Sequence, residues 1–265
     1  MGSSAFGGRG DQVREYFRQK GTVSKWWDPE RDALKHFFLH EIRIFDSLVK
    51  NLPKDITVLD VCTGRGRFAI RLAELGFKHV EGVDISKEML SLAFKTCAER
   101  GVSVNFKFDE AEKLQTIEDG TVSVICLMDA FDHIPDTRAT LRTILTKLRS
   151  DGMLIGTFVN SNSLYGLLFS MYQRLFGHSK MIAQVFSPGE FRQHLKNSGF
   201  TLDQLIGIEI FNLPHSRIPI FRWLLLPFRI LGRIEGMLFN GYKTPLLAHL
   251  SVMIIFVAKR NNPSK

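Results

Sequence analysis

Short apolar segments alternate with amphipathic segments over much of the chain, and this alternation restricts the fold more than any other feature. Apolar runs of strand length predict buried strands, whereas apolar residues that recur every three or four positions predict helices. The predicted strands span 57–61, 79–83, 103–107, 121–128 and 153–159. The predicted helices span 65–75, 86–99, 137–149 and 28–50, the last with Asp28 as N-cap and Pro29 at its first position. This order predicts an α/β fold, a doubly wound and mostly parallel sheet with helices on both faces.

The last third of the chain departs from this alternation. An apolar, aromatic-rich helix is predicted at 161–177, and Ser187 with Glu190 forms the capping box of another helix. Two further strands are predicted at 203–211 and 251–258, the last of them antiparallel. They complete a seven-stranded sheet.

The expected organisation is one domain, 28–265, preceded by a flexible leader and N-terminal cap segment, 1–27. Helical insertions are expected after the fifth and sixth strands, at 160–187 and 212–250. The second insertion combines apolar and aromatic residues with many bases and a single acid, Glu235; its bases are Arg217, Arg222, Arg229, Arg233 and Lys243.

Composition excludes several classes of protein. The cysteines Cys62, Cys97 and Cys126 have no metal-ligand spacing, so we expect a reducing, cytoplasmic location and no metal site. The longest apolar stretches, 218–231 and 245–258, are too short to span a membrane. A net charge of +8 suits an anionic surface or an acidic substrate, and equally a soluble protein that is simply basic.

A glycine turn follows the first predicted strand. Gly64 and Gly66 permit a tight turn and a close approach of a ligand to the main chain, where a doubly wound sheet binds its ligands. An acid stands at the end of each of three successive strands: Asp60, Asp84, and the pair Asp109–Glu110. Asp84 occupies the position from which a carboxylate accepts hydrogen bonds from ribose hydroxyls.

These segments resemble the motifs of the class I S-adenosylmethionine-dependent methyltransferases. The stretch "VLDVCTGRGRFAIRLAELG" is similar to the first motif of that family, and "VEGVDISKEML" to the second. "FDEAEKLQTIEDGTVSVICLMDAFDHIPD" resembles the third and fourth, and "LRSDGMLIGTFVN" the motif on the fifth strand. The resemblance implies a Rossmann-like methyltransferase fold and S-adenosylmethionine as cofactor.

The resemblance also implies roles for single residues. Asp84 would bind the ribose diol, Met89 or Ile85 would pack on adenine, and Glu110 with the backbone of Ala111 would meet the adenine amine. The full set of implied cofactor-binding residues is Asp60, Cys62, Thr63, Gly64, Gly66, Arg67, Asp84, Ile85, Met89, Asp109, Glu110, Ala111, Leu127 and Met128.

Two positions depart from the family pattern. Cys62 stands where the first glycine of the loop is usual, and Asp109 where a glycine usually precedes the acid after the third strand. Whether Asp109 or Glu110 reaches adenine therefore stays open. Arg65 occupies a commonly small position, where it either points to solvent or meets an acid.

His133, beyond the fourth strand, is the preferred candidate for a general base, because an imidazole ordinarily titrates near neutral pH. Asp129 and Asp132 are candidates to orient it or the acceptor. The Asn/Asp-Pro-Pro-Tyr signature of base-amine methylation and a cysteine pair for C5-pyrimidine chemistry are both absent, which argues against a nucleic-acid acceptor.

The apolar insertions favour a small or lipid-like acceptor, methylated on oxygen as in quinone, polyketide or glycolipid biosynthesis. Alternatives are N- or C-methylation of a natural product, a cofactor-binding partner protein without catalysis, and a nicotinamide-dependent oxidoreductase. For the basic, aromatic insertion 212–250 we weigh a substrate lid, peripheral membrane contact, a homodimer interface, or additional core.

Overall fold

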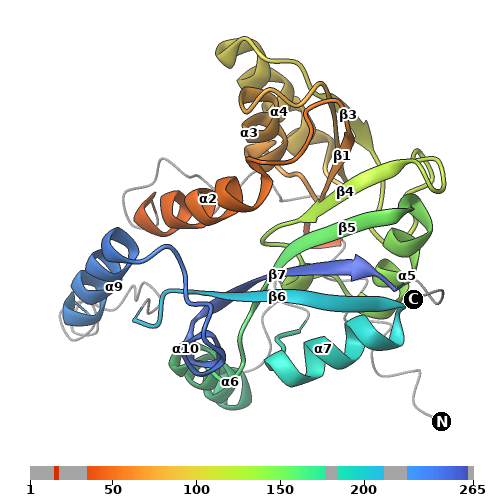
Figure 1. The fold of residues 1–265 in the computed structure, drawn as a ribbon. Helices are drawn as coiled ribbons and strands as arrows, with labels where there is room; N and C mark the ends of the chain where they lie inside the picture. Colours follow the sequence, from red (N-terminus) through yellow and green to blue (C-terminus); the bar gives the residue numbers. More distant parts are fainter. Residues whose placement is uncertain (1–14, 18–34, 177–183, 212–225, 262–265) are drawn as a thin grey trace.

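The computed structural model describes residues 15–17, 35–176, 184–211 and 226–261. The strands are β1 (Thr57–Val61), β2 (His79–Asp84), β3 (Asn105–Phe108), β4 (Val122–Leu127), β5 (Leu148–Val159), β6 (Phe200–Ile208) and β7 (Met253–Arg260). They form one seven-stranded sheet in the order β3-β2-β1-β4-β5-β7-β6 (Figure 1). Only β7 runs antiparallel to its neighbours, β5 and β6. The predicted doubly wound, mostly parallel sheet with an antiparallel last strand is confirmed.

Helices cover both faces of this sheet (Figure 1). They are α2 (Lys35–Val49), α3 (Arg67–Glu74), α4 (Lys87–Arg100), the 3-10 turn η2 (Phe131–His133), α5 (Thr137–Lys147), α6 (Leu164–Phe176), α7 (Pro188–Asn197), α9 (Leu226–Leu238) and α10 (Pro245–Leu250). The predicted N-cap of the first helix, Asp28, lies outside the described residues. The capping box predicted at Ser187 and Glu190 is present at the start of α7.

Each face of the sheet has its own hydrophobic core. On one face α2 and α3 pack on the sheet through buried aromatic residues such as Phe45 and Phe68, whose ring centroids are 4.8 Å apart. On the other face Phe131, Phe158 and Phe191 form a cluster in which the rings of Phe158 and Phe191 stack at 4.3 Å. Buried rings contribute both apolar area and specific edge or stacking geometry, so the two cores hold the helices in defined positions.

The largest differences between the predicted and the observed strand boundaries are in β5 and β6; β2, β3, β4 and β7 are shifted by only one or two residues. β5 begins at Leu148 rather than at 153, because Leu148 pairs with Val122 before an irregularity in the strand pairing. Residues 149–151 are exposed and polar, so the sequence pattern does not indicate a strand there. β6 spans 200–208 rather than 203–211, because Glu209 has a left-handed backbone (φ 46°) that ends the strand.

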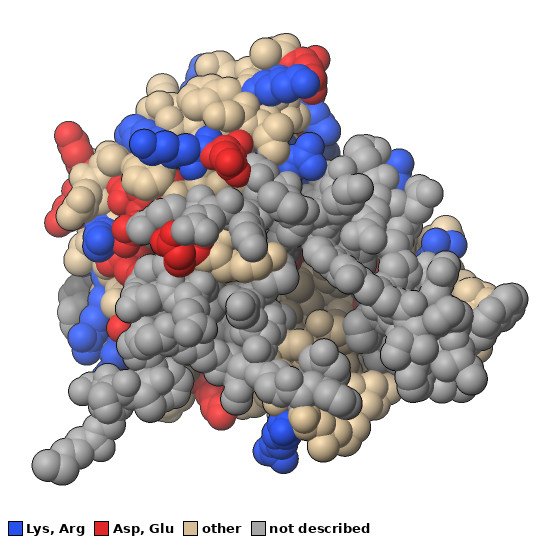
Figure 2. All heavy atoms as spheres, turned by 180° about the vertical axis from the view of Figure 1, so that it is seen from behind, with Lys and Arg blue, Asp and Glu red and all other residues tan. Residues whose placement is uncertain are grey.

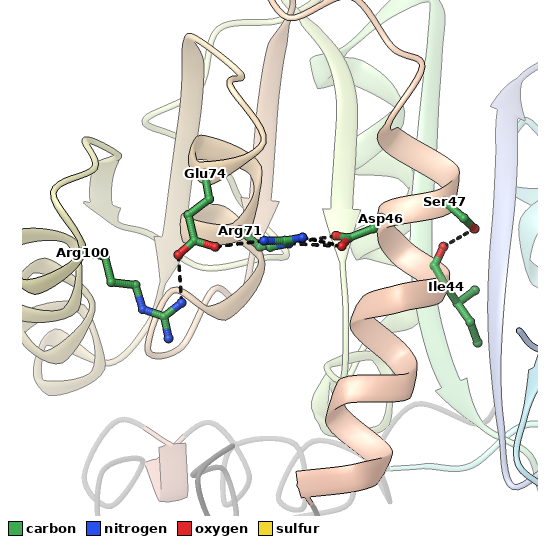
Figure 3. Close-up of polar contacts among 6 residues, drawn as sticks. All are labelled: Ile44, Asp46, Ser47, Arg71, Glu74 and Arg100. Atoms are coloured by element: carbon green, nitrogen blue, oxygen red, sulfur yellow. Dashed lines mark hydrogen bonds and ion pairs between the residues drawn. The ribbon is translucent and has the colours of Figure 1, made fainter. Parts of the chain in front are cut away.

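Charged side chains of both signs are interspersed over the upper part of the molecule, the region of α3, α4 and β3 (Figure 2). Beside this region an ion-pair chain joins α2, α3 and α4 (Figure 3). Arg71 on α3 contacts Asp46 on α2 at 2.6 Å and Glu74 at 3.3 Å, and Arg100 on α4 contacts Glu74 at 2.9 Å. Ion pairs that are this exposed contribute little stability individually. Together they connect the three helices to one another.

The glycine turn after β1 and the starts of both insertions lie at one edge of the sheet. β1, β2, β4, β5 and β6 all run in the same direction, so their carboxyl ends share that edge. Val159 at the end of β5 and Ile208 at the end of β6 both pair with Met253 at the start of β7. The insertions after β5 and β6 therefore begin at the same edge of the sheet as the glycine turn after β1, although they are far from it in sequence.

The turn after β1 provides a stability test. Gly66 has φ 81°, and a Cβ there would lie 3.0 Å from Ile70 Cδ1 and 3.1 Å from Ala93 Cβ. Gly120 has a similar φ of 69°, but a Cβ there would meet nothing within 4 Å. We expect Gly120→Ala to lower the free energy of unfolding by about 1 kcal/mol through backbone strain alone. Gly66→Ala should lower it by about 2–4 kcal/mol, because overpacking adds to that strain.

Urea unfolding of the two variants, monitored by circular dichroism, measures this difference. Equal losses at the two positions would show that the contacts around Gly66 do not restrict the turn.

Candidate active site

A cavity of about 950 Å³ lies at the carboxyl edge of the sheet. Among the predicted site residues, those that line it are Asp60, Cys62, Thr63, Gly64, Arg67, Asp84, Ile85, Met89, Asp109, Glu110, Ala111, Met128, Asp129 and His133. Gly66, Leu127 and Asp132 do not line it, and their predicted roles stay predictions. The cavity brings together residues from four strand ends.

The turn after β1 presents its main chain to this cavity. Asp60 Oδ2 accepts hydrogen bonds from Thr63 Oγ1 (2.6 Å) and from the Ala69 N–H (3.1 Å), which ties the turn to the start of α3. Gly64 has φ 55°, and a Cβ there would meet nothing within 4 Å. Cys62, with φ 58°, adopts the left-handed conformation for which a glycine is usual. Asp60 therefore fixes the turn through hydrogen bonds, and the space beside Gly64 is open.

Asp84, at the end of β2, is fixed from both sides. Its Oδ2 accepts from the Gly64 N–H (2.8 Å) and its Oδ1 from the Ser86 N–H (2.8 Å), and Ser86 in turn caps α4 by accepting from the Met89 N–H. Each carboxylate oxygen keeps acceptor capacity for another donor. Burial raises the pKa of Asp84, against the backbone hydrogen bonds that lower it. A pair of ligand hydroxyls suits this acceptor.

Asp109 and Glu110 differ in what already binds them. Asp109 is buried, and its two oxygens accept from the Glu110 N–H (2.8 Å) and from the N–H and Oγ1 of Thr116 (2.7 Å each). Glu110 is half-buried and contacts Lys113 on the surface at 3.0 Å. These contacts favour Asp109 as the residue that shapes the loop and Glu110 as the one that faces an adenine amine.

An ion triplet of one buried and two partly buried side chains, which was not predicted from the sequence, adjoins the turn. Arg67 Nη2 contacts Glu41 Oε2 of α2 at 2.8 Å and also pairs with Asp129 Oδ2 beyond β4. The guanidinium lies 4.4 Å from the ring centroids of Phe38 and Phe68. Burial, together with Asp129, raises the pKa of Glu41 well above its ordinary value. Arg67 thus connects α2, α3 and the segment after β4.

The sequence does contain a signal for Glu41. It lies on the apolar stripe of α2, one helical turn from Phe37 and Phe45, and its side chain is fully buried. A carboxylate at such a position requires a cationic partner. Arg67 is that partner, so a predicted cofactor-binding residue has an observed role in holding Asp129.

The cavity residues fit S-adenosylmethionine. The Asp84 carboxylate suits a ribose diol, and the open face of Gly64 leaves room for a ligand against the main chain. Asp129 Oδ1 is buried and has no hydrogen-bond partner among the described residues, although Asp129 lines the cavity. An unpaired buried carboxylate oxygen calls for a donor such as an ammonium or hydroxyl group.

Comparison with known proteins identifies the family. The sequence profile of the methyltransferase domain family matches residues 12–205, and the chain belongs to this family. It is a class I S-adenosylmethionine-dependent methyltransferase.

The relatives include enzymes that act on small molecules. A ubiquinone biosynthesis O-methyltransferase from Cupriavidus pinatubonensis is 27% identical over 190 residues, 69% of this chain and 75% of that protein. Among solved structures, an S-adenosylmethionine-dependent methyltransferase from Thermotoga maritima has a TM-score of 0.64 at 19% identity, covering 94% of this chain and 100% of that one. Magnesium protoporphyrin IX methyltransferase from Synechocystis, with bound S-adenosylhomocysteine, has a TM-score of 0.60 at 18% identity, covering 96% and 100%. The solved structures share the fold.

Asp132 provides a pH-dependent test of the segment after β4. It is buried, its Oδ1 accepts from the Val159 N–H (3.0 Å), and burial raises its pKa from 3.8 to about 7. The folded chain therefore binds a proton there more tightly than the unfolded chain does. Asp132 contributes stability at low pH, and this contribution is lost as the pH rises from about 4 to above 7.

Asp132→Asn removes that proton while keeping a carbonyl that can accept from Val159. We expect the stability of the variant relative to wild type to rise by roughly 4 kcal/mol between about pH 4 and pH 8. Urea unfolding of both proteins across this pH range measures the difference in their free energies of unfolding. Asp60 titrates in both proteins, so its contribution cancels in this difference. A pH-independent difference would show that Asp132 titrates at its ordinary pKa in the folded protein.

Proposed function

We propose that this methyltransferase methylates a hydroxyl of a small or lipid-like aromatic acceptor of the quinone-precursor type. The observation that carries the proposal is the position of His133, which lines the cavity beside Asp129 at the end of β4. Two apolar groups lie near it: Ile134 also lines the cavity, and the ring centroid of Phe17 lies 4.9 Å from that of the imidazole. The ubiquinone biosynthesis O-methyltransferases among the relatives support this choice of acceptor.

The cofactor half of the cavity positions the methyl donor. S-adenosylmethionine supplies a methyl group on a sulfonium, already activated for transfer. Asp84 and Glu110 would hold its adenosyl part, and the turn from Cys62 to Gly64 would receive the methionine part. These residues perform no bond-making themselves; positioning the two reactants is the main catalytic contribution in such a transfer.

The acceptor half of the cavity would remove the proton of the acceptor hydroxyl. The new bond between the acceptor oxygen and the methyl carbon would form as the carbon–sulfur bond breaks and S-adenosylhomocysteine leaves. An imidazole nitrogen of His133 would take the hydroxyl proton, which avoids a positively charged methylated product. Asp129 is less suited to this task because Arg67 holds its Oδ2. Its Oδ1 remains to accept a hydrogen bond from the acceptor or the cofactor. The apolar contact with Phe17 excludes water from one side of the imidazole.

We expect His133→Gln to lower kcat for an alkylated catechol by about 10²- to 10⁴-fold, the usual contribution of a general base. Affinity for S-adenosylhomocysteine should stay within about twofold, since no cofactor contact changes. Product formation is measured by mass spectrometry. His249→Gln is the matched control, because His249 lies on α10 outside the cavity and should keep wild-type kcat.

An arylamine and an activated carbon acid serve as competing acceptors in the same assay. Methylation of the amine or the carbon alone would contradict the hydroxyl proposal. Wild-type kcat of His133→Gln on the catechol would contradict the role of His133.

A further inference from the structure

The insertion helices α6, α9 and α10 each expose large apolar side chains to solvent, and we call these residues together the insertion surface. Its exposed residues on α6 are Leu164, Leu167, Leu168, Met171 and Leu175, and those on α9 and α10 are Leu226, Ile230, Leu231, Ile234, Met237, Leu238, Leu246 and Leu250. On α6 and α9 they recur every three or four positions, with some adjacent pairs, so each helix exposes one apolar stripe. Leu175 is 69% exposed and Leu246 is 72% exposed. Exposed apolar area of this kind usually marks an interaction site.

The outward direction of these stripes follows from contacts on the opposite side. On α9, Glu235 is buried and accepts from the N–H groups of Ile210 (2.7 Å) and Phe211 (3.1 Å), while the Gly236 carbonyl accepts from Arg43 on α2. At the start of α6, the Asn160 side chain donates to the carbonyls of His249 (2.8 Å) and Ser251 (2.9 Å) at the end of α10. The side of α9 that carries Glu235 is thus bound to the rest of the molecule, and Asn160 connects the start of the first insertion to the end of α10.

Charge indicates what covers this surface. Within the described parts of α6, α9 and α10 the one acid is Glu235, which is buried. Exposed bases border the apolar stripes at Arg174, Arg233 and Lys243. The absence of exposed acid contrasts with the mixed charges over α3, α4 and β3 (Figure 2). An apolar face with a basic border and no exposed acid is complementary to a bilayer with anionic headgroups.

We propose that the insertion surface binds an anionic lipid bilayer. No helix in the described ranges is long and apolar enough to cross a membrane, so the helices would lie in the interface with their apolar stripes among the acyl chains. Arg174, Arg233 and Lys243 would contact the headgroups.

The cavity extends to this surface. Arg233, Gly236 and Met237 of α9 line the cavity, and Met237 is also 76% exposed on the insertion surface. Lys35 and His36 of α2 line the same region. This step rests on the proposed function, in which the acceptor is lipid-like. Such an acceptor would pass from the bilayer into the cavity past α9 without crossing bulk water.

Sedimentation with vesicles tests the proposal on the whole chain. Vesicles of phosphatidylcholine alone are compared with vesicles that also contain phosphatidylglycerol, at low and at high salt. We expect binding to the anionic vesicles that weakens with salt, because surface charges are screened. The triple variant Leu167→Gln/Met171→Gln/Leu175→Gln should bind them at least about tenfold more weakly, since it removes apolar groups from the bilayer.

The controls distinguish bilayer binding from the proposed methylation of a small or lipid-like acceptor. Glutamine has a helix propensity close to that of leucine and methionine, and none of the three positions lines the cavity. The triple variant should therefore bind S-adenosylhomocysteine and methylate a water-soluble catechol as wild type does. Lys95→Gln, an exposed base on α4, should leave vesicle binding unchanged.

Lys243→Gln should weaken binding to the anionic vesicles. Wild-type protein that stays in the supernatant with anionic vesicles would overturn the proposal, whether or not it methylates the catechol. Undiminished vesicle binding by the triple variant would also overturn it. A wild-type dimer in sedimentation velocity that the triple variant converts to monomer would assign the surface to a second copy of the chain instead.

Discussion

The geometry of the site depends on the ion pairs of the partly buried Arg67 guanidinium. It pairs with Glu41 of α2 and with Asp129 beyond β4, and it lies between the rings of Phe38 and Phe68. Removing one member of a buried ion group typically costs about 3–5 kcal/mol, because it leaves the others uncompensated. The same pairing holds Asp129 at φ 52° against the cavity. Stability and the shape of the site therefore depend on the same atoms.

Strand direction explains why the cavity residues and the starts of both insertions lie at one edge of the sheet. The carboxyl ends of β1, β2 and β4 supply Asp60, Asp84 and Asp129, while the insertions after β5 and β6 start at the same edge. Several of the acids there are buried: burial raises the pKa of Asp60 to about 7 and that of Asp84 as well. A cationic ligand would stabilise their ionised forms, which suits a sulfonium-bearing cofactor.

The parts of this account that depend on local sequence could be predicted. Strand length, glycine turns and strand-end acids are local features, so the sheet, Gly64 and Asp84 were all identifiable from the residues themselves. The ion triplet was not, because Glu41, Arg67 and Asp129 meet only when α2 docks on α3. Its one sequence signal is a carboxylate within the apolar stripe of α2. Similarly, the early start of β5 was concealed because its first residues are polar and exposed while their backbone pairs with β4.

Calorimetric titration with S-adenosylmethionine, S-adenosylhomocysteine and NAD tests most directly that Asp84 and the glycine turn form the cofactor site. We expect saturable binding of both adenosyl ligands and none of NAD. Asp84→Ala should weaken the adenosyl ligands by about ten- to hundredfold through the lost charged hydrogen bonds, whereas Asp119→Ala, at an exposed acid outside the cavity, should not. A folded Asp84→Ala variant with wild-type affinity for the adenosyl ligands, or binding of NAD in place of those ligands, would contradict this assignment of the cofactor site.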